Sequence, residues 1–280
     1  MHKDIDSLRM VTIEDVIQET PSVKTFVFKD NFSNLALPGQ FLMVWIPRFE
    51  EIPISIMIAE KKNYSAITIR KRGYGSTALS NFKKRDKIGI RGPYGNSFTL
   101  KDNFKTIILI GGGTGMVPLV RLLNTTRFKE LTIIIIMGSK TKEEIFFVKI
   151  INKILENHKS FRLLISTEDG SFGIKGLPID ILNDVLQKKE YGYIDMIYTC
   201  GPELMMKKIY DIAAGKKIPI QASLERYMKC GIGICSSCCI NDLLVCYDGT
   251  IFYNEQLQNL SEFGISYRDK AGRVQKYIVD

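Results

Sequence analysis

Four closely spaced cysteines near the end of this 280-residue chain constrain its fold more than any other feature. The pattern is Cys230-x4-Cys235-x2-Cys238, followed after seven residues by Cys246. Thiolates bind soft metals, and the x4, x2 spacing is typical of plant-type 2Fe–2S sites. The intervening glycines of residues 231–234 let the backbone fold tightly around sulfur and turn its N–H groups toward it. A four-cysteine zinc site, which usually shows two Cys-x2-Cys pairs, remains the alternative.

The position of Cys239 and the residues at the N-terminus lead to two further expectations. Cys239 adjoins Cys238, so its side chain is expected to point away from the cluster. Residues 1–10 carry Asp4, Asp6 and Arg9 and show no apolar signal region. Clustered cysteines without such a region favour metal or redox chemistry in a reducing compartment over disulfides. We therefore predict a cytoplasmic protein.

Charge and hydropathy exclude two classes of partner. No apolar run approaches the roughly 20 residues that a membrane span needs, so no membrane partner is expected. The formal net charge is +9, and residues 61–91, with ten basic residues and one acid, contribute 10 − 1 = +9. Such a local excess indicates an anionic ligand or partner more than general nucleic-acid binding. A solvated basic surface is the alternative.

The N-terminal third has the pattern of a small antiparallel β-barrel. At about 150 residues per domain, 280 residues predict two or three domains. Short strands are expected over Val23–Phe28, Phe41–Ile46, Ile54–Ile58 and Ser65–Arg70, separated by Gly and Pro turns. We assign residues 1–101 to this first, barrel domain.

Residues 102–221 alternate between strand and helix patterns. Because strands that alternate with helices form parallel sheets, we predict a doubly wound α/β nucleotide domain here. A third region, 222–280, holds the cysteine module and a polar tail. The expected strands are Thr106–Ile110, Leu131–Met137, Arg162–Ser166 and Met196–Cys200, and the expected helices are Val117–Leu123, one opened by Thr141 with Glu144 at capping-box spacing, Ile179–Leu186 and one after Gly201-Pro202.

A glycine-rich turn between the first strand and helix of this domain is a candidate nucleotide site. It reads Gly111, Gly112, Gly113, Thr114, Gly115. Bare glycines let backbone approach phosphate, and a helix N-terminus favours negative charge. The turn is not the GxGxxG fingerprint, so a tight structural turn remains open. No acid ends the strand over 131–137, which leaves NAD and NADP open, and Lys140 could meet a 2′-phosphate.

Two further segments fit nucleotide binding. Residues 70–77 combine basic side chains, glycines and hydroxyls, as a pyrophosphate site would, although a basic β-turn is the alternative. Cys200 and Gly201 lie at the carboxyl end of an expected parallel strand, where doubly wound sheets place ligands. A buried core cysteine is the alternative there.

Several stretches together carry a family resemblance. They are Pro53-Ile54-Ser55-Ile56, Gly75-Ser76-Thr77, Arg91–Gly95, Gly111–Pro118, Asp169–Gly173, Thr199–Pro202 and Ser223–Cys235. Over residues 8–260 the chain resembles the ferredoxin–NADP reductase superfamily and, within it, the electron-transfer subunits of dihydroorotate dehydrogenase B.

The resemblance implies three cofactors and assigns residues to each. FAD would contact Ile52, Pro53, Ile54, Ser55, Thr68, Ile69, Arg70, Gly75, Ser76 and Thr77. NAD would face Gly111–Gly115 with Cys200 and Gly201, and Ser55 and Cys200 would be the catalytic residues. Cys230, Cys235, Cys238 and Cys246 would bind the 2Fe–2S cluster.

The chain departs from the family pattern at two places. Ile52 stands where the family usually has a flavin-binding Arg, so the FAD phosphate needs another cation, for which Arg70 is the candidate. The gap between Cys238 and Cys246 is also shorter than is common.

The resemblance implies an NAD-linked oxidoreductase subunit that acts with a catalytic partner. That partner would be an FMN-containing, dihydroorotate-oxidising subunit of pyrimidine biosynthesis, in a heterotetramer with two copies of each. The tail over 261–280 is expected to contact it. A reductase subunit of a hydrogenase, sulfur reductase or other NAD(P)H-linked complex would have the same domain order. A zinc-stapled, non-catalytic nucleotide-binding regulator is the alternative outside redox enzymes.

Overall fold

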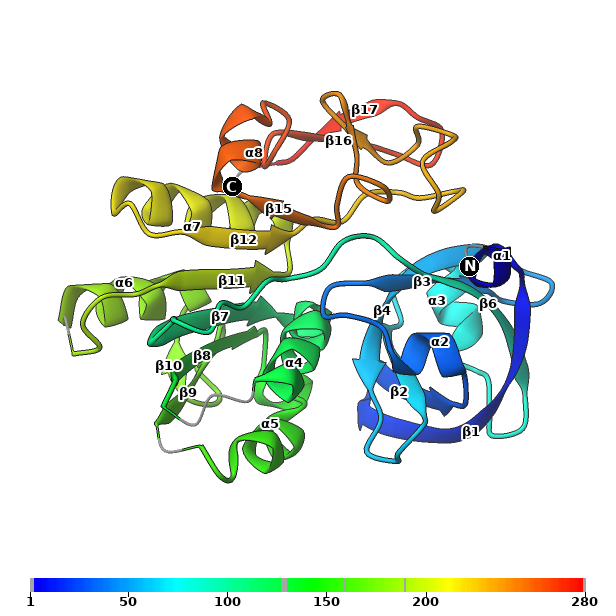
Figure 1. The fold of residues 1–280 in the computed structure, drawn as a ribbon, viewed down its shortest axis with the longest axis horizontal. Helices are drawn as coiled ribbons and strands as arrows, with labels where there is room; N and C mark the ends of the chain where they lie inside the picture. Colours follow the sequence, from blue (N-terminus) through cyan, green and yellow to red (C-terminus); the bar gives the residue numbers. More distant parts are fainter. Residues whose placement is uncertain (1–2, 127–129, 159, 189, 279–280) are drawn as a thin grey trace.

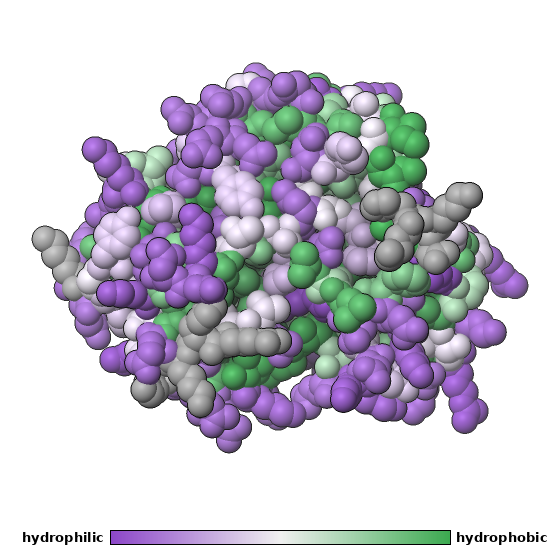
Figure 2. Space-filling model, in the orientation of Figure 1, coloured by the Kyte–Doolittle hydropathy of each residue, from purple (hydrophilic) through white to green (hydrophobic). Residues whose placement is uncertain are grey.

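A β-barrel, a layered α/β sheet and a C-terminal segment meet along one junction in the computed structural model of the chain (Figure 1). The structure describes residues 3–126, 130–158, 160–188 and 190–278. Figure 2 shows hydrophilic side chains over most of the visible face, with smaller hydrophobic patches among them. Among the described residues, no helix combines the length and apolarity needed to cross a membrane.

The predicted N-terminal barrel is confirmed. Its six strands close in the order β1-β2-β5-β4-β3-β6, and every neighbouring pair is antiparallel. Alternate side chains, such as those of Phe26 and Phe28, fill the interior because strand residues two apart share a face. The elements are α1 (Lys3–Asp6), β1 (Arg9–Thr20), β2 (Val23–Phe28), α2 (Asn31–Asn34), β3 (Phe41–Trp45), β4 (Glu51–Ile58), β5 (Ser65–Arg70), α3 (Tyr74–Leu79) and β6 (Lys87–Tyr94).

The predicted doubly wound sheet is also confirmed. Seven strands run in the order β10-β9-β8-β7-β11-β12-β15, and all pairs are parallel except β12 with β15. The strands are β7 (Thr106–Gly112), β8 (Thr132–Ser139), β9 (Phe161–Thr167), β10 (Ile174–Lys175), β11 (Met196–Cys200), β12 (Ile220–Ser223) and β15 (Ile251–Tyr253). The helices are α4 (Met116–Thr125), α5 (Val148–Leu155), α6 (Pro178–Lys188) and α7 (Glu203–Gly215).

Both faces of the central strands β7 and β8 are buried, which explains their long apolar runs. Ile108 and Ile110 pack in the core that includes residues of α6 and α7. Ile107 and Leu109 pack in the opposite core, with residues of α4 and α5. The alternation along β7 therefore places one helical layer on each side.

The prediction that a helix begins at Thr141 is wrong. Thr141 precedes only a short 3-10 turn, η2 (Lys142–Glu144), and α5 begins at Val148. A capping box would need the Glu144 carboxylate to turn back onto the start of the helix. Instead, that carboxylate accepts a hydrogen bond from Arg70 of the barrel at 3.0 Å. A contact between domains has replaced the local one.

The C-terminal segment is joined to both other parts. Its strand β15 extends the sheet, and the Asn96 side chain of the barrel segment bonds the backbone N–H and C=O of Ile251. The remaining elements are β13 (Cys239–Ile240), β14 (Leu243–Leu244), α8 (Asn254–Asn259), β16 (Ser266–Arg268) and β17 (Val274–Lys276). The cysteine region is thus anchored at both ends, by β12 and by β15.

A buried arginine fixes the barrel to the sheet. Arg121 of α4 is 6% exposed, and its guanidinium donates to the carbonyls of Ser33, Asn34, Ala36 and Met57. Burial lowers its pKa to about 10. Three of these carbonyls lie at the end of α2, where the helix dipole favours a cation. The Arg121 side chain is a strut between the barrel and the sheet domain.

Replacing Arg121 tests this strut. We expect Arg121→Ala to cost about 2–4 kcal/mol of unfolding free energy, because it leaves several buried carbonyls without donors. Urea denaturation followed by circular dichroism measures the loss. Arg162→Ala is the control, since its 3.5 Å ion pair with Glu190 is exposed and should matter by less than about 0.5 kcal/mol. Equal losses in the two variants would contradict the role of Arg121.

Candidate functional site

A pocket of about 220 Å³ lies where the barrel, the glycine turn and the chain leaving β12 converge. The barrel contributes β4 and the end of β5, and the sheet contributes the start of α4. The lining residues are Phe41, Ile52, Pro53, Ile54, Ser55, Thr68, Ile69, Arg70, Ser76, Thr114, Val117, Ser223, Leu224, Glu225, Arg226, Met228 and Thr250. Such a mixed apolar and polar cleft between domains is a common place for a cofactor.

Many of the residues predicted to bind flavin line this pocket. They are Ile52, Pro53, Ile54, Ser55, Thr68, Ile69, Arg70 and Ser76, and Thr114 of the glycine turn joins them. The predicted residues Gly75, Thr77, Gly111, Gly112, Gly113, Gly115, Cys200 and Gly201 are not among the lining residues.

One wall of the pocket escaped sequence analysis. It consists of the end of β12 and the residues after it (Ser223, Leu224, Glu225, Arg226 and Met228), together with Phe41, Val117 and Thr250. The stretch 223–235 carried part of the family resemblance, but none of its residues before Cys230 was assigned to a cofactor. The signal that could have found the wall is its position at the carboxyl end of a parallel strand.

The donor groups of the pocket suit a flavin nucleotide. Arg70 and Arg226 both line it, and neither Nε atom has a hydrogen-bond partner among the described residues, although both atoms are buried. Arg226 is only 6% exposed and its terminal nitrogens pair with Glu203. Unpartnered guanidinium N–H groups next to apolar walls match a ring system with carbonyl and phosphate oxygens. The residues present therefore fit FAD.

The glycine turn packs against the end of β11. β7 and β11 are neighbours in the sheet, and the chain leaves them toward opposite faces, which makes their carboxyl ends a topological switch point. A Cβ on Gly115 would lie 2.2 Å from the carbonyl oxygen of Cys200. Glycine at this position thus allows the turn and the Cys200-Gly201 loop to lie side by side. A nicotinamide nucleotide would bind along this edge.

Cys200 lies behind the pocket wall. Its thiol is 2% exposed and is hydrogen-bonded to Ser223, which does line the pocket. Burial raises the pKa of this thiol, and the nearby Glu225 carboxylate raises it further. At neutral pH Cys200 is therefore a protonated thiol, able to donate a hydrogen bond rather than act as a thiolate.

The four cluster cysteines lie in a loop rich in N–H···S contacts. The N–H of Gly233 donates to Cys246 Sγ at 3.2 Å, and that of Ile234 donates to Cys230 Sγ at 3.4 Å. The N–H of Cys246 donates to Cys238 Sγ at 3.4 Å. Such donors stabilise negative charge on sulfur and tune iron–sulfur centres.

Hydrogen bonds link the cysteines in two pairs, because the N–H of Cys235 donates to Cys230 Sγ at 3.5 Å and that of Cys246 donates to Cys238 Sγ at 3.4 Å. Burial opposes ionisation of Cys235, but hydrogen bonds with Ser237 and Cys230 lower its pKa to about 6. A hydrogen bond from Cys246 lowers the pKa of Cys238 to about 7 and raises that of Cys246. In the described part of the chain, no three His, Cys, Asp or Glu side chains gather closely enough to hold one metal ion. Two pairs of thiols match two irons with two thiolate ligands each.

The cluster loop is fixed to the barrel beside the pocket. A Cβ on Gly231, whose φ is +76°, would lie 2.5 Å from Met43 of β3. Arg91 of β6 donates to the carbonyl oxygen of Cys230 at 3.1 Å while its guanidinium also pairs with Glu51. Met228 lines the pocket, and Cys230 follows two residues later, within about 7 Å of backbone reach.

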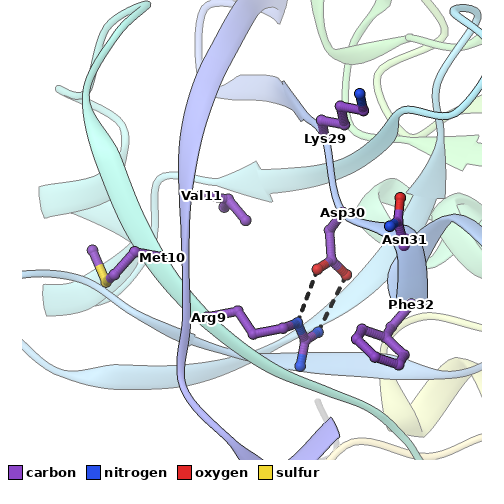
Figure 3. A pocket seen from close by; sticks show the side chains of 7 residues that line it. All are labelled: Arg9, Met10, Val11, Lys29, Asp30, Asn31 and Phe32. Atoms are coloured by element: carbon purple, nitrogen blue, oxygen red, sulfur yellow. Dashed lines mark hydrogen bonds and ion pairs between the residues drawn. The ribbon is translucent and has the colours of Figure 1, made fainter. Parts of the chain in front are cut away.

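A second cavity, of about 350 Å³, lies on the barrel near β1 and α2 and holds none of the predicted residues (Figure 3). Two oppositely charged side chains in its lining pair with each other, because Arg9 Nε donates a hydrogen bond to the Asp30 carboxylate at 2.8 Å. Asp30 also accepts the N–H and hydroxyl of Ser33, and these bonds hold its pKa low despite burial. We therefore place the cofactor in the smaller pocket.

Comparison with known proteins agrees with this geometry. Residues 225–258 match the family model for the iron–sulfur cluster binding domain of dihydroorotate dehydrogenase B. Residues 109–211 match the oxidoreductase NAD-binding domain.

Curated relatives extend over nearly the whole chain. A protein of Methanocaldococcus jannaschii named "Probable dihydroorotate dehydrogenase B (NAD(+)), electron transfer subunit" is 39% identical over 93% of this chain and 95% of its own length. A protein of Pyrococcus furiosus with the same name is 39% identical over 95% and 98%.

Solved structures share the architecture. A chain of an NADH-dependent reduced ferredoxin-NADP oxidoreductase, studied for flavin-based electron bifurcation, gives a TM-score of 0.76 at 25% identity and covers 92% of this chain and 95% of its own. A ferredoxin NADP+ reductase from Neisseria gonorrhoeae with bound FAD and NADP gives 0.62 at 19% identity, covering 74% and 91%, and supports the fold alone.

The contact between Gly115 and Cys200 generates a stability prediction. We expect Gly115→Ala to lose about 1–3 kcal/mol, because the new methyl group must push two backbone segments apart. Gly215→Ala is the control, since nothing lies within 4 Å of the corresponding Cβ. Thermal melting of both variants measures the difference, and equal midpoints would refute the packing argument.

Proposed function

Because this chain belongs to the family of dihydroorotate dehydrogenase B electron transfer subunits, we propose that it passes electrons between a dihydroorotate-oxidising partner and NAD. It is a subunit of an NAD-linked flavin oxidoreductase family, and its cofactors are FAD, a 2Fe–2S cluster and NAD.

The observation that carries the proposal is the short connection between pocket and cluster loop. The residues after β12 first form a wall of the pocket and then reach Cys230, which Arg91 holds to the barrel. When bound, a flavin exchanges electron pairs with nicotinamide and single electrons with iron–sulfur clusters. A protein that performs this exchange must place the two cofactors next to each other, and a connection this short would allow it.

The chain's own residues then have separate tasks. Pro53, Ile54 and Ser55 would line the flavin, and Arg70 would meet its phosphates. The glycine turn and Gly201 would orient the nicotinamide nucleotide. Cys200 lies behind the pocket wall, hydrogen-bonded to Ser223, so its neutral thiol would act on the bound nucleotides only through that residue. The N–H donors of residues 233–235 would stabilise charge on the cluster.

We propose that the partner is an FMN-containing catalytic subunit in a heterotetramer with two copies of each chain. A cytoplasmic location and the contact of residues 261–280 with the partner also stay predictions. Co-expression with a candidate dihydroorotate dehydrogenase catalytic subunit tests the assembly. A stable complex that reduces NAD+ with dihydroorotate is the expected result. Failure to associate would favour a reductase subunit of another redox complex.

Removing one cluster ligand separates the two halves of the proposed path. We expect Cys235→Ser to keep NADH-dependent flavin reduction but to lose at least about 90% of partner-coupled turnover, because single-electron exit needs the cluster. Stopped-flow absorbance measures the first activity, and dihydroorotate-dependent NAD+ reduction by the complex measures the second.

Cys239→Ser is the matched control for that experiment. Its backbone pairs in β13 with Leu244, outside the two thiol pairs, so cluster absorbance and coupled turnover should persist. Wild-type coupled turnover in Cys235→Ser, or loss of the cluster in Cys239→Ser, would contradict the ligand assignment.

A further inference from the structure

The proposed FAD site lacks the cation that its family supplies from β4. Ile52 occupies that position and lines the pocket with an apolar side chain. The preceding residues are acidic, Glu50 and Glu51. Glu51 is neutralised by Arg91, whose guanidinium donates two hydrogen bonds to it, at 2.8 and 2.6 Å. Glu50 is satisfied in a different way.

The Glu50 carboxylate bridges two donors. Its Oε1 accepts the backbone N–H of Gly75 at 2.7 Å, and its Oε2 accepts a hydrogen bond from Lys270 Nζ at 2.9 Å. Gly75 belongs to the segment proposed to bind the FAD diphosphate. A carboxylate and a phosphate are both oxyanions that use the same kinds of donor. The Glu50 carboxylate therefore occupies a position where the Gly75 N–H and the Lys270 ammonium group together bind negatively charged oxygen atoms.

Lys270 is presented by an ordered hairpin rather than a loose tail. It lies in the turn between β16 and β17, where Asp269 Oδ1 accepts the N–H groups of Ala271 and Arg273, each at 2.9 Å. Arg268, just before the turn, pairs with Glu262 and donates to the carbonyl of Cys239. The turn thus has a fixed base on the cluster module.

Lys270 lies next to the pocket rather than in its lining. Glu50, which it contacts, precedes the pocket-lining Ile52 by two residues, and Gly75, which donates to Glu50, precedes the pocket-lining Ser76. The Lys270 side chain is 68% exposed, and the side chain of Glu50, with which it pairs, is 21% exposed. A flexible, exposed ammonium can follow an incoming anion without loss of packing.

We propose that Lys270 supplies a second cation for the FAD diphosphate, beside Arg70, at a position where Ile52 supplies none, and that Glu50 occupies this position until the nucleotide displaces it. The inference rests on the proposed FAD site and adds to it a binding residue from the C-terminal hairpin. When FAD binds, Glu50 turns away from Gly75, and both the N–H and Lys270 exchange a carboxylate oxygen for phosphate oxygens. The hairpin is thereby coupled to flavin occupancy.

FAD affinity tests the proposal without any turnover. The full chain is stripped of flavin, and quenching of FAD fluorescence on titration gives Kd. We expect Lys270→Ala to raise Kd about five- to tenfold, and Lys270→Arg to restore it within about twofold. Glu50→Gln should lower Kd about two- to fivefold, because a charge that repels phosphate is lost. The dependence of Kd on salt should be weaker in Lys270→Ala.

Lys276→Ala is the matched control on the same hairpin, and its Kd should stay within about twofold of the wild-type value. A wild-type Kd in Lys270→Ala, or an equal loss in Lys276→Ala, would overturn the proposal. A tighter Kd in Lys270→Ala would also overturn it. Each of these results still shows FAD bound by the chain, whereas failure of the wild-type protein to bind FAD at all would refute the proposed function itself.

Discussion

The contact on which the rest of the structure depends is the one that Arg91 makes across the junction of barrel and cluster loop. Its planar guanidinium pairs with Glu51 on β4 and donates to the backbone of Cys230. The residues that follow Glu51 line the pocket, and Cys230 is the first cluster cysteine. Because Arg presents a rigid fork of donors, one side chain can set the position of the cluster loop relative to the flavin wall.

The sheet topology brings the remaining parts to the same place. The carboxyl ends of β7 and β11 form the edge proposed to bind the nicotinamide nucleotide, and the next strand, β12, leads directly into the pocket wall and then the cysteines. β15 returns the chain to the sheet beside β12, so both ends of the cluster loop are held next to the carboxyl end of β11. Arg121 closes the arrangement by fixing α4 to the barrel. Three binding parts meet at one junction because each is anchored to at least one of the others.

Local patterns predicted the barrel and the sheet because their strands are decided by burial. Residues 107–110 of β7 are all apolar since both faces of the sheet are covered there, and the glycine turn and the cysteine spacing are equally local signals. Contacts between distant residues have no such signal. Glu144 matched a capping box but pairs with Arg70, 74 positions earlier. Glu50 and Lys270 are 220 positions apart, and the wall from Ser223 to Met228 becomes visible only once β12 is placed beside β11.

The central claim is that this one chain holds a flavin and an iron–sulfur cluster close enough to exchange electrons. An anaerobic titration of the full chain with NADH, followed by visible absorbance, tests it most directly. The account predicts a flavin and iron–sulfur spectrum in which the flavin bleaches and the cluster absorbance then falls without any partner present. A flavin that bleaches while the cluster stays oxidised, or a protein that remains colourless after reconstitution with iron, sulfide and FAD, would contradict it.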